Sequence, residues 1–389
     1  MEQPKKIRMG MVGGGQDAFI GAVHRMAANL DGNIELVCGA FSSNPAKSVS
    51  SGTKLYLPAE RCYADYAQMF AEEAKLPVHQ RMQFVSIVTP NHLHFPVAKA
   101  ALEAGFHVLS DKPATFTLQQ ALDLAEVLKT SSQLYGLTHT YNGYPLVKQA
   151  QHIIASGQLG KITKVIVEYT QGWLADKEGD SGKQASWRVD PARAGISCCM
   201  GDIGVHAANL AEYVLGSNIA AMCSDLGSVV DGRLLDDDGT ILLRFSNGAR
   251  GVLLSSQIQV GDENNLRLRI YGDKGSIEWS QLEPNSLLHK SNTASTQLIR
   301  TGVGKLCAAA QNATRTPAGH PEGYLEAFAN IYGNFVKQIR AFEAGEAHSN
   351  EEFDVPGIDE AIRGMAFIEN SVKFSQSTTK WHDFSISAS

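Results

Sequence analysis

The feature that most constrains the fold is a run of glycines near the N-terminus, between a short apolar segment and a helical pattern. Residues 7–12 read Ile-Arg-Met-Gly-Met-Val and predict a buried strand, and residues 13–18 read Gly-Gly-Gly-Gln-Asp-Ala. Apolar side chains between residues 18 and 30 then recur near one face of a helix. The spacing G-x-G-x-x-A between a strand and a helix is an accepted form of the dinucleotide-binding fingerprint. It predicts a Rossmann-type domain that begins at this strand.

Each position of the fingerprint has a physical reason. Gly13 allows the tight turn, and Gly15 lets the backbone approach a pyrophosphate group with no side chain between them. Ala18 keeps the helix close to the strand. The amide groups and the positive dipole end at the N-terminus of the helix then attract the phosphates. We therefore expect dinucleotide contacts from Gly13, Gly15, Gln16, Asp17 and Ala18.

The end of the second predicted strand, residues 34–41, indicates which dinucleotide binds. NAD-binding proteins usually place Asp or Glu there to hold the ribose 2′-hydroxyl, whereas this chain continues with Ser42, Ser43 and Asn44. Small hydroxyl groups with Lys47 nearby can accept a 2′-phosphate, so the sequence favours NADP and leaves NAD open. The alternative interpretation is that Ser42 and Ser43 only cap the helix that follows.

The remainder of the first 140 residues alternates between strands and helices, as parallel βαβ units do. Strands are predicted at 84–89, 106–110 and 134–138, with helices at 96–104 and 118–130. The segment 84–89 is almost continuously apolar, which is typical of a strand buried on both faces.

The pattern changes near residue 145. After a predicted helix at 146–156, stretches rich in β-forming residues follow at 162–171, 220–230, 240–245, 249–260 and 266–271. Asn247-Gly248 between two of them is a strong hairpin signal, and helical patterns return at 324–344 and 358–374. The predicted fold class is α/β plus α+β. A Rossmann domain spans residues 1–142, and an α+β domain with a mostly antiparallel sheet spans residues 143–389.

Composition disfavours several classes of protein. A net charge of −6 disfavours a basic nucleic-acid-binding surface. The sequence contains no stretch of 18 apolar residues, so no membrane span is predicted. The apolar segment at the N-terminus is too short and too rich in glycine for a signal peptide. Six cysteines with no C-x-x-C pair are typical of reduced thiols rather than of a secreted disulfide framework. We therefore expect a cytoplasmic protein with no nucleic-acid or membrane partner.

Three further clusters place reactive side chains at the ends of predicted elements. The first, Thr89-Pro90-Asn91-His92-Leu93-His94, follows a strand, at the edge where open α/β sheets bind ligands. Its His-x-His pair has no Cys or carboxylate at a usual ligand spacing, so we expect no metal there. The run Asp236-Asp237-Asp238 is interpreted as a solvated turn rather than as a metal site.

The second cluster, Asp111-Lys112-Pro113, also follows a strand. A lysine there can polarise or protonate a substrate oxygen; the alternative is a surface lysine before a helix. The third cluster reads Gly201-Asp202-Ile203-Gly204-Val205-His206. If it is helical, Asp202 and His206 are four residues apart on one face, which suits proton transfer. The alternative is an ordinary helix pair or a half-buried histidine satisfied by its neighbour.

Together these motifs resemble the Gfo/Idh/MocA family, the glucose-fructose oxidoreductase and inositol dehydrogenase-like enzymes. The resemblance extends over essentially the whole chain, because the fingerprint and the three clusters occur in the family's order and spacing. Two shorter matches, Gly157-Gln158-Leu159-Gly160-Lys161-Ile162 and Trp187-Arg188, lie between them. Cys198-Cys199 precedes the third cluster and has no role that the sequence assigns.

The resemblance implies roles for individual residues. The lysine of the family's E-K-P motif, here Lys112, lies beside the nicotinamide and the reacting carbon, and Asp111 replaces the commoner glutamate with a side chain one methylene shorter. The aspartate and histidine of a D-x-G-x-H motif, here Asp202 and His206, line the substrate pocket, and the histidine is usually assigned as the base. Residues implied to lie near the cofactor ribose and nicotinamide are Thr89, Pro90, Asn91, His94, Asp111 and Lys112.

The resemblance also implies a substrate class and an assembly. Candidate substrate contacts are Trp187, Arg188, His320 and Tyr324, in addition to Lys112, Asp202 and His206. Trp173 and Trp187 can stack against a sugar ring, but core packing explains each at least as well. Ordinary packing of a helix that begins with a proline explains His320 and Tyr324 equally well. In the family, one face of a large open sheet covers the active site and the other commonly forms a dimer, so a homodimer or homotetramer is implied.

The implied activity is hydride transfer between NAD or NADP and a secondary alcohol or ketone of a sugar, cyclitol or derivative. Two alternatives stay open at this point. One is a non-catalytic NAD(P)-binding regulator of the same fold, and the other is a glycosidase that uses NAD transiently. The sequence does not name the substrate.

Overall fold

The computed structural model describes residues 5–16, 18–177, 185–347 and 353–387. It separates into two compact units, one formed by residues 1–138 with 328–362 and the other by residues 139–327 with 363–389. The expected division was a single boundary after residue 142. Residues 328–362 instead join the first unit, because Phe335 and Tyr332 pack against Phe84 with ring centroids 5.6 and 6.4 Å apart.

The first unit contains a five-stranded parallel sheet in the order β2-β1-β3-β4-β5. Its strands are β1 (Ile7–Gly13), β2 (Ile34–Ala40), β3 (Phe84–Val88), β4 (His107–Ser110) and β5 (Tyr135–Leu137). Its helices are α1 (Phe19–Asn29), α2 (Pro45–Lys54), α3 (Tyr66–Lys75), α4 (His94–Glu103), α5 (Leu118–Thr130) and most of α11 (Tyr324–Glu343). The predicted Rossmann alternation is therefore confirmed.

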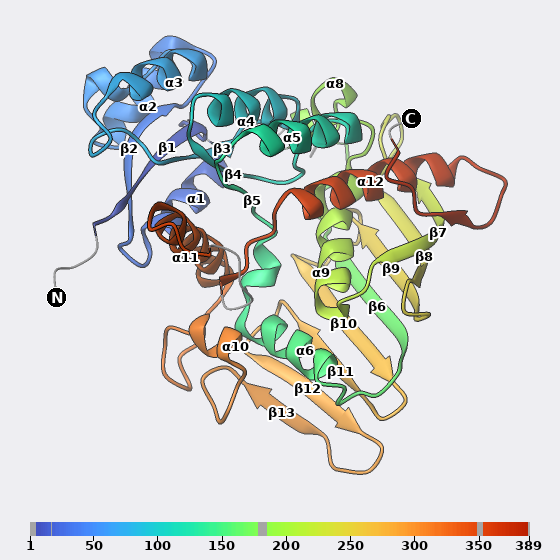
Figure 1. Ribbon diagram of the computed structural model, residues 1–389. Coiled ribbons are helices and arrows are strands. Elements are labelled where there is room, and N and C mark those ends of the chain that lie inside the picture. Colours follow the sequence, from blue (N-terminus) through green and yellow to red (C-terminus); the bar gives the residue numbers. More distant parts are fainter. Residues whose placement is uncertain (1–4, 17, 178–184, 348–352, 388–389) are drawn as a thin grey trace. The chain divides into compact units, whose positions relative to one another are not determined.

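Both faces of this sheet are covered, as the apolar character of β3 requires. Val85 and Ile87 point into a core shared with α3, α4 and α5, whereas Phe84 and Ser86 face α11 through Phe335 and Tyr332. Helices α1 and α11 lie on the face opposite α4 and α5 (Figure 1). The carboxyl ends of β1, β3 and β4 thus meet at one edge, where the predicted cofactor residues lie.

The second unit contains a nine-stranded sheet in the order β13-β12-β11-β10-β6-β9-β8-β7-β14, antiparallel except between β6 and β9. Its strands are β6 (Ile162–Thr170), β7 (Ile219–Gly227), β8 (Asp238–Phe245), β9 (Arg250–Ser256), β10 (Asn265–Gly272), β11 (Gly275–Ser280), β12 (Ser286–Ser291), β13 (Gln297–Arg300) and β14 (His382–Asp383). The predicted large, mostly antiparallel sheet is confirmed. The hairpin is confirmed as well, because β8 and β9 pair antiparallel around Gly248, whose φ is +88°.

Helices of the second unit pack against this sheet or against one another. They are α6 (Pro145–Ala155), α7 (Ala185–Arg188), α8 (Pro191–Ala194), a π-helical turn (Met200–Gly204), α9 (Val205–Leu215), α10 (Ala308–Asn312) and most of α12 (Ile358–Ser375). Helix α9 contacts β6 and β9, and α6 contacts β11 and β12. Alternate residues of β8 are buried and exposed, as expected when only one sheet face is packed.

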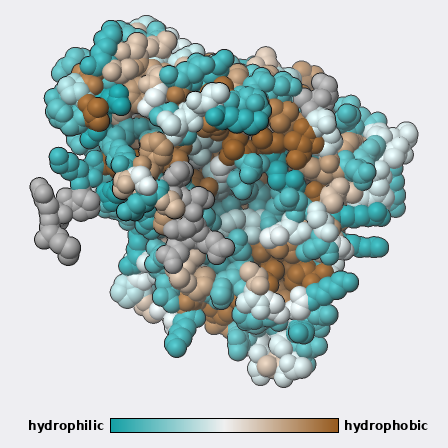
Figure 2. Space-filling view, in the orientation of Figure 1, coloured by the Kyte–Doolittle hydropathy of each residue, from teal (hydrophilic) through white to brown (hydrophobic). Residues whose placement is uncertain are grey.

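The surface is mixed in character. Figure 2 shows hydrophobic residues in several groups between larger hydrophilic areas on the face that it draws. Among the helices of the described segments, none is both long and apolar enough to cross a lipid bilayer. The described residues also contain no group of three or more His, Cys, Asp or Glu placed to hold a metal ion.

Candidate active site

The glycine-rich turn of the first unit is shaped for close approach. Gly13 has φ +84°, and a Cβ added there would lie 2.7 Å from the carbonyl oxygen of Val88. A Cβ on Gly15 would lie 2.7 Å from the carbonyl oxygen of Phe41, to which the Gly15 amide donates at 3.2 Å. Side chains at either position are therefore excluded by neighbouring backbone, and the turn exposes main chain to a ligand.

The helix that follows this turn presents its positive end. Helix α1 begins at Phe19 after Ala18, which provides no side-chain cap, and its first turn contains no acidic residue. Free amides at such an end attract anionic groups. The helix approaches the turn closely at Gly21, where an added Cβ would lie 2.3 Å from Gly14 Cα. Asp17, a predicted contact, lies outside the described residues.

Helix α2 supports the same turn from the side. Gln16 accepts from Lys54 Nζ at 3.0 Å and donates to Ser50 Oγ at 2.8 Å, and its amide donates to Ser51 Oγ at 3.2 Å. Arg25 on α1, which sequence reasoning missed, donates to the Gly14 carbonyl at 2.7 Å. These contacts hold the turn in place.

The residues expected to choose between NAD and NADP lie between β2 and α2. Asn44, rather than Ser42 or Ser43, caps α2, and its Oδ1 accepts from the Lys47 amide at 3.0 Å. Ser42 Oγ accepts from the Asn44 amide at 3.1 Å, while Ser43 and Lys47 are exposed. The alternative that both serines serve as the helix cap is therefore wrong, because Asn44 occupies the capping position.

The segment after β3 contains His94, which lies between two backbone carbonyls, and Thr89, whose hydroxyl has no hydrogen-bond partner among the described residues. Both ring nitrogens of the buried His94 lie near carbonyl oxygens, Nδ1 at 2.6 Å from Pro113 and Nε2 at 2.8 Å from Thr89. Burial lowers the pKa of His94, and Asp111 with the two carbonyls offsets this only in part. His94 thus joins the backbone of two predicted cofactor segments. Asn91 is buried beside it, after Pro90.

The Thr89 hydroxyl supports a ligand at this edge. Its Oγ1 is buried and has no hydrogen-bond partner within the described part of the chain. A buried hydroxyl is normally satisfied, so a bound group that supplies the missing partner fits this position. Together with the open turn and the uncapped helix end, this atom makes the first unit suitable for a dinucleotide.

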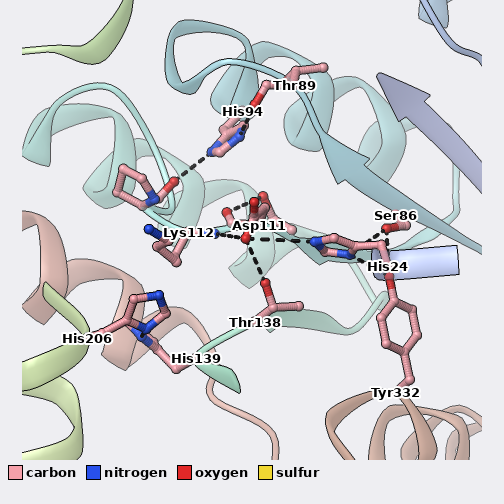
Figure 3. Close-up of polar contacts among 12 residues, drawn as sticks. His24, Ser86, Thr89, His94, Asp111, Lys112, Thr138, His139, His206 and Tyr332 are labelled. Atoms are coloured by element: carbon pink, nitrogen blue, oxygen red, sulfur yellow. Dashed lines mark hydrogen bonds and ion pairs between the residues drawn. The ribbon is translucent and has the colours of Figure 1, made fainter. Parts of the chain in front are cut away.

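Asp111 and Lys112 follow β4 at the same edge (Figure 3). Asp111 Oδ1 accepts from the Lys112 amide at 2.9 Å and from the Thr138 hydroxyl at 3.0 Å. Burial alone would raise the pKa of the Asp111 carboxyl, but the imidazole of His24, 3.8 Å away, and the charge of Lys112 outweigh it and hold the pKa below its ordinary value. The shorter carboxylate therefore stays ionised and anchors the residue that bears the candidate catalytic amine.

In the second unit, the π-helical turn carries Asp202 and leads directly into α9, whose second residue is His206. Turns of this type occur frequently at functional sites. The predicted helix is therefore present, with a π-helical first turn. Buried Asp236 fixes its start, since the carboxylate accepts from the amides of Cys198 at 3.0 Å and Met200 at 2.8 Å.

The interpretation of Asp236 and Asp237 as a solvated turn is wrong. Both are buried, and Asp237 accepts from the amides of Val229 and Val230 and from Arg233 at 2.8–3.1 Å. Burial raises the pKa of Asp236, and its backbone and hydroxyl donors offset this only in part. Asp236 reads as solvated because its amide partners, Met200 and Cys198, lie 36 and 38 residues away in the chain.

Asp202 lies in a polar cluster with Arg188 and Gln257. Its Oδ2 is 3.1 Å from Arg188 Nε and accepts from Gln257 Nε2 at 3.0 Å. The Arg188 guanidinium lies over the Trp187 ring, 4.4 Å from its centroid, and 5.9 Å from that of Trp173, which is 40% exposed. The structure thus brings predicted substrate residues together. Gln257 is an addition, since its position within a β-rich stretch gave no signal.

His206 is surrounded by aromatic side chains. Its Nδ1 is 3.4 Å from Nδ1 of His139, and the Tyr141 ring meets it edge-on at 5.0 Å. Tyr169 shares a short hydrogen bond with Tyr141 and donates to Asn264. These neighbours were missed because they come from the turn after β5 and from β6. These histidine and tyrosine side chains place polar atoms among aromatic rings, a composition typical of small-molecule sites.

The two candidate substrate contacts near the start of α11, His320 and Tyr324, have different surroundings. Tyr324 begins that helix and lies 6.3 Å from Tyr141 between ring centroids, so it belongs to the aromatic group around His206. His320 is exposed, and its Nδ1 lies 3.2 Å from the carbonyl oxygen of Pro317. The buried carboxylate of Glu322 holds this loop by accepting from the Arg315 and Thr316 amides.

Comparison with known proteins identifies the family. Residues 7–139 match the model of an oxidoreductase family with an NAD-binding Rossmann fold, and residues 147–278 match the GFO/IDH/MocA C-terminal domain. The chain is 35% identical over 384 residues to the uncharacterized oxidoreductase YfiI of Bacillus subtilis, covering 98% of this chain and 97% of that protein. This chain belongs to the Gfo/Idh/MocA family of oxidoreductases.

Solved structures of the family agree with this assignment. An inositol dehydrogenase homologue from Azotobacter vinelandii in complex with NAD⁺ is 35% identical, has a TM-score of 0.94 and matches over 98% of both chains. An oxidoreductase from Sinorhizobium meliloti is 41% identical with a TM-score of 0.87, over 97% of this chain and 100% of that one. The resemblance read from the motifs is thus confirmed, as is the two-part fold of this Gfo/Idh/MocA oxidoreductase.

Proposed function

We propose that this oxidoreductase is an NAD(P)-dependent dehydrogenase for a secondary alcohol of a sugar, cyclitol or related polyol. The observation that carries the proposal is Lys112, held by an ionised Asp111 at the carboxyl edge of a sheet whose glycine-rich turn suits a dinucleotide. Two relatives support the substrate class. One is the Azotobacter vinelandii homologue in complex with NADH and myo-inositol, 34% identical over 98% of both chains, and the other is a levoglucosan dehydrogenase from Pseudarthrobacter phenanthrenivorans, 27% identical over 97% of this chain and 98% of that protein.

The dinucleotide would be held by three parts of the first unit. The main chain at Gly13 and Gly15 and the N-terminus of α1 take the pyrophosphate, and the Thr89 segment takes the nicotinamide end. Bound NAD or NADP supplies the hydride acceptor for alcohol oxidation. Because the cofactor carries the redox chemistry, the chain itself must bind, orient and move a proton.

We assign the proton to His206 and the charge stabilisation to Lys112. His206 takes the hydroxyl proton as the alcohol becomes a ketone. Because Nδ1 of His206 lies 3.4 Å from Nδ1 of His139, that proton has a path towards His139. The Lys112 ammonium donates to the same oxygen and stabilises the negative charge that develops there. Asp202, fixed by Arg188 and Gln257, lines the pocket and orients the substrate hydroxyls.

We further propose that NADP is accepted alongside NAD. No acidic side chain occurs between Phe41 and Ser51, and exposed Lys47 can pair with a 2′-phosphate. Initial rates with both cofactors at equal concentration test this. A preference for NAD of more than about 1000-fold, or about 4 kcal/mol, would contradict it.

The exposed face of the second unit's sheet supports a proposal about assembly. Ile166, Val252 and Leu242 form an apolar row across β6, β9 and β8, and Leu242 is 38% exposed in the single chain. We propose a homodimer or homotetramer through this face, to be checked by light scattering.

All six cysteines are free thiols, which supports a cytoplasmic location, to be checked by cell fractionation.

A screen of sugars and cyclitols with NAD and NADP, followed by the absorbance of the reduced nicotinamide, tests the proposed activity. Steady accumulation of NADH or NADPH with a polyol is the expected result. Cleavage of a glycoside without net reduction would identify the transient-redox glycosidase instead. Tight dinucleotide binding with no turnover of any member would favour the regulator.

A further inference from the structure

A buried polar chain runs behind Asp111 in the first unit (Figure 3). His24, fully buried on α1, lies 2.7 Å from the Tyr332 hydroxyl through its Nδ1. That hydroxyl is 2.8 Å from Ser86 Oγ, which is also 3.4 Å from His24 Nδ1. These three polar side chains, from α1, β3 and α11, thus serve as hydrogen-bond partners for one another inside the protein and need no water for this.

The other end of this chain faces the carboxylate that holds Lys112. His24 Nε2 lies 3.8 Å from Asp111 Oδ1, an ion-pair distance beyond the range of a normal hydrogen bond. The same oxygen accepts from the Lys112 amide at 2.9 Å and from the Thr138 hydroxyl at 3.0 Å. All three contacts therefore converge on one atom, so a shift of the carboxylate disturbs the backbone of Lys112 directly.

Two features separate this arrangement from ordinary buried packing. The Asp111 side chain is only 15% exposed, and a carboxylate so largely removed from water without fixed polar neighbours is costly and either moves or takes up a proton. The imidazole sits on α1, the helix whose N-terminus is shaped for the pyrophosphate. The ring is locked on its far side, since Phe328 meets it edge-on at 4.6 Å.

We propose that His24 is a positioning residue for Lys112: together with Tyr332 and Ser86 it fixes the Asp111 carboxylate, and through it the amine-bearing segment. This inference rests on the proposed function for the meaning of Lys112, but its contacts lie wholly within the first unit. His24 touches neither substrate nor cofactor in this role. It acts only through Asp111.

Three variants of the chain test the role. His24→Leu removes both contacts, His24→Gln keeps one N–H donor and one acceptor, and Tyr332→Phe removes only the hydroxyl. Tyr63→Phe is the matched control, because its hydroxyl donates at 2.9 Å to buried Glu73 in the same unit, in a network separate from Asp111. Each variant is measured as the full chain.

Single-turnover hydride transfer with the polyol found by the screen is the first readout. Because misplacement by about 1 Å can cost about 100-fold in rate, we expect His24→Leu to lose about 10- to 100-fold and Tyr332→Phe a smaller part of this. His24→Gln should recover most of the rate, and the dissociation constant for NADH should stay within about twofold in all variants. Tyr63→Phe should reduce stability without lowering the rate.

The second readout needs no substrate. Reductive ¹³C-methylation labels the lysines, and the signal lost in Lys112→Arg identifies Lys112 in the NMR spectrum. That signal should move in His24→Leu and stay in place in Tyr63→Phe. If it stays in place in His24→Leu, or if the His24→Leu rate matches that of Tyr63→Phe, the positioning role is wrong. A wild-type chain that oxidises no polyol would overturn the proposed function, and the lysine signal would still decide the role of His24.

Discussion

Replacing Gly21 by alanine tests how closely the first helix must approach the glycine-rich turn. An added Cβ at Gly21 would lie 2.3 Å from Gly14 Cα and 2.7 Å from its carbonyl oxygen, where ordinary contact begins at 3.4 Å. The backbone must therefore separate by about 1.1 Å to restore ordinary contact. Both partners are main chain, so no side chain can rotate away.

The magnitude follows from that separation. Overpacking of this kind typically costs about 1–3 kcal/mol. If the turn keeps its native shape, the strain lowers the free energy of unfolding. If the turn relaxes in the free protein and NADH binding restores its native shape, the strain lowers the affinity for NADH. In the second case the dissociation constant for NADH rises about 5- to 150-fold. The higher helix propensity of alanine, worth up to about 1 kcal/mol, offsets only part of this.

Two measurements decide the outcome, a fluorescence titration with NADH and urea unfolding. Gly333→Ala is the control, because it lies within α11 of the same unit and its added Cβ would have its nearest neighbour at 3.7 Å. That variant should keep its affinity and gain up to about 1 kcal/mol of stability. Gly21→Ala with unchanged affinity and unchanged stability would refute the reasoning.

Three further predictions concern the polar residues of the site. Lys112→Ala should lower kcat far more than it weakens NADH binding. If kcat and NADH affinity fell by the same factor, the proposed role of Lys112 in the reaction would be wrong. Because the pKa of Asp111 is depressed in the folded state, its contribution to stability is present above its unfolded pKa of about 4 and is lost as the pH falls below it. The stability difference between wild type and Asp111→Asn should therefore shrink from pH 5 towards pH 2 in urea titrations, and a constant difference would contradict the depressed pKa. Gln257→Leu removes a donor to Asp202 and should reduce kcat/KM for the polyol about 10-fold with unchanged NADH affinity, whereas wild-type kcat/KM would show that Asp202 needs no such support.

Local signals predicted much of the fold. The glycine turn, the buried strand before it and the helix after it were readable because each depends on neighbours within a few residues. The hairpin at Gly248 was readable for the same reason, since Asn-Gly fixes the turn and the flanking strands fix the register. The positions of Lys112, Asp202 and His206 came from motif order, and their roles stay predictions.

Long-range contacts explain what sequence reasoning missed or misread. Asp236 appeared solvated because nothing near it in the chain shows the amides of Cys198 and Met200 that it accepts. Tyr332 lies 246 residues after Ser86, with which it shares a hydrogen bond. The return of residues 328–362 to the first unit has the same origin, since an amphipathic helix does not reveal which sheet it covers.

The sequence by itself determined the dinucleotide turn, the succession of parallel and antiparallel sheets, and the residue types that can move a proton. Those properties follow from backbone sterics and from side-chain periodicity, which act over short distances along the chain. Only the tertiary structure decided which carboxylates are buried, which histidine lies behind Asp111 and which glutamine holds Asp202. Burial and partner choice depend on segments that meet in space after folding, and the electrostatics of this site depend on both.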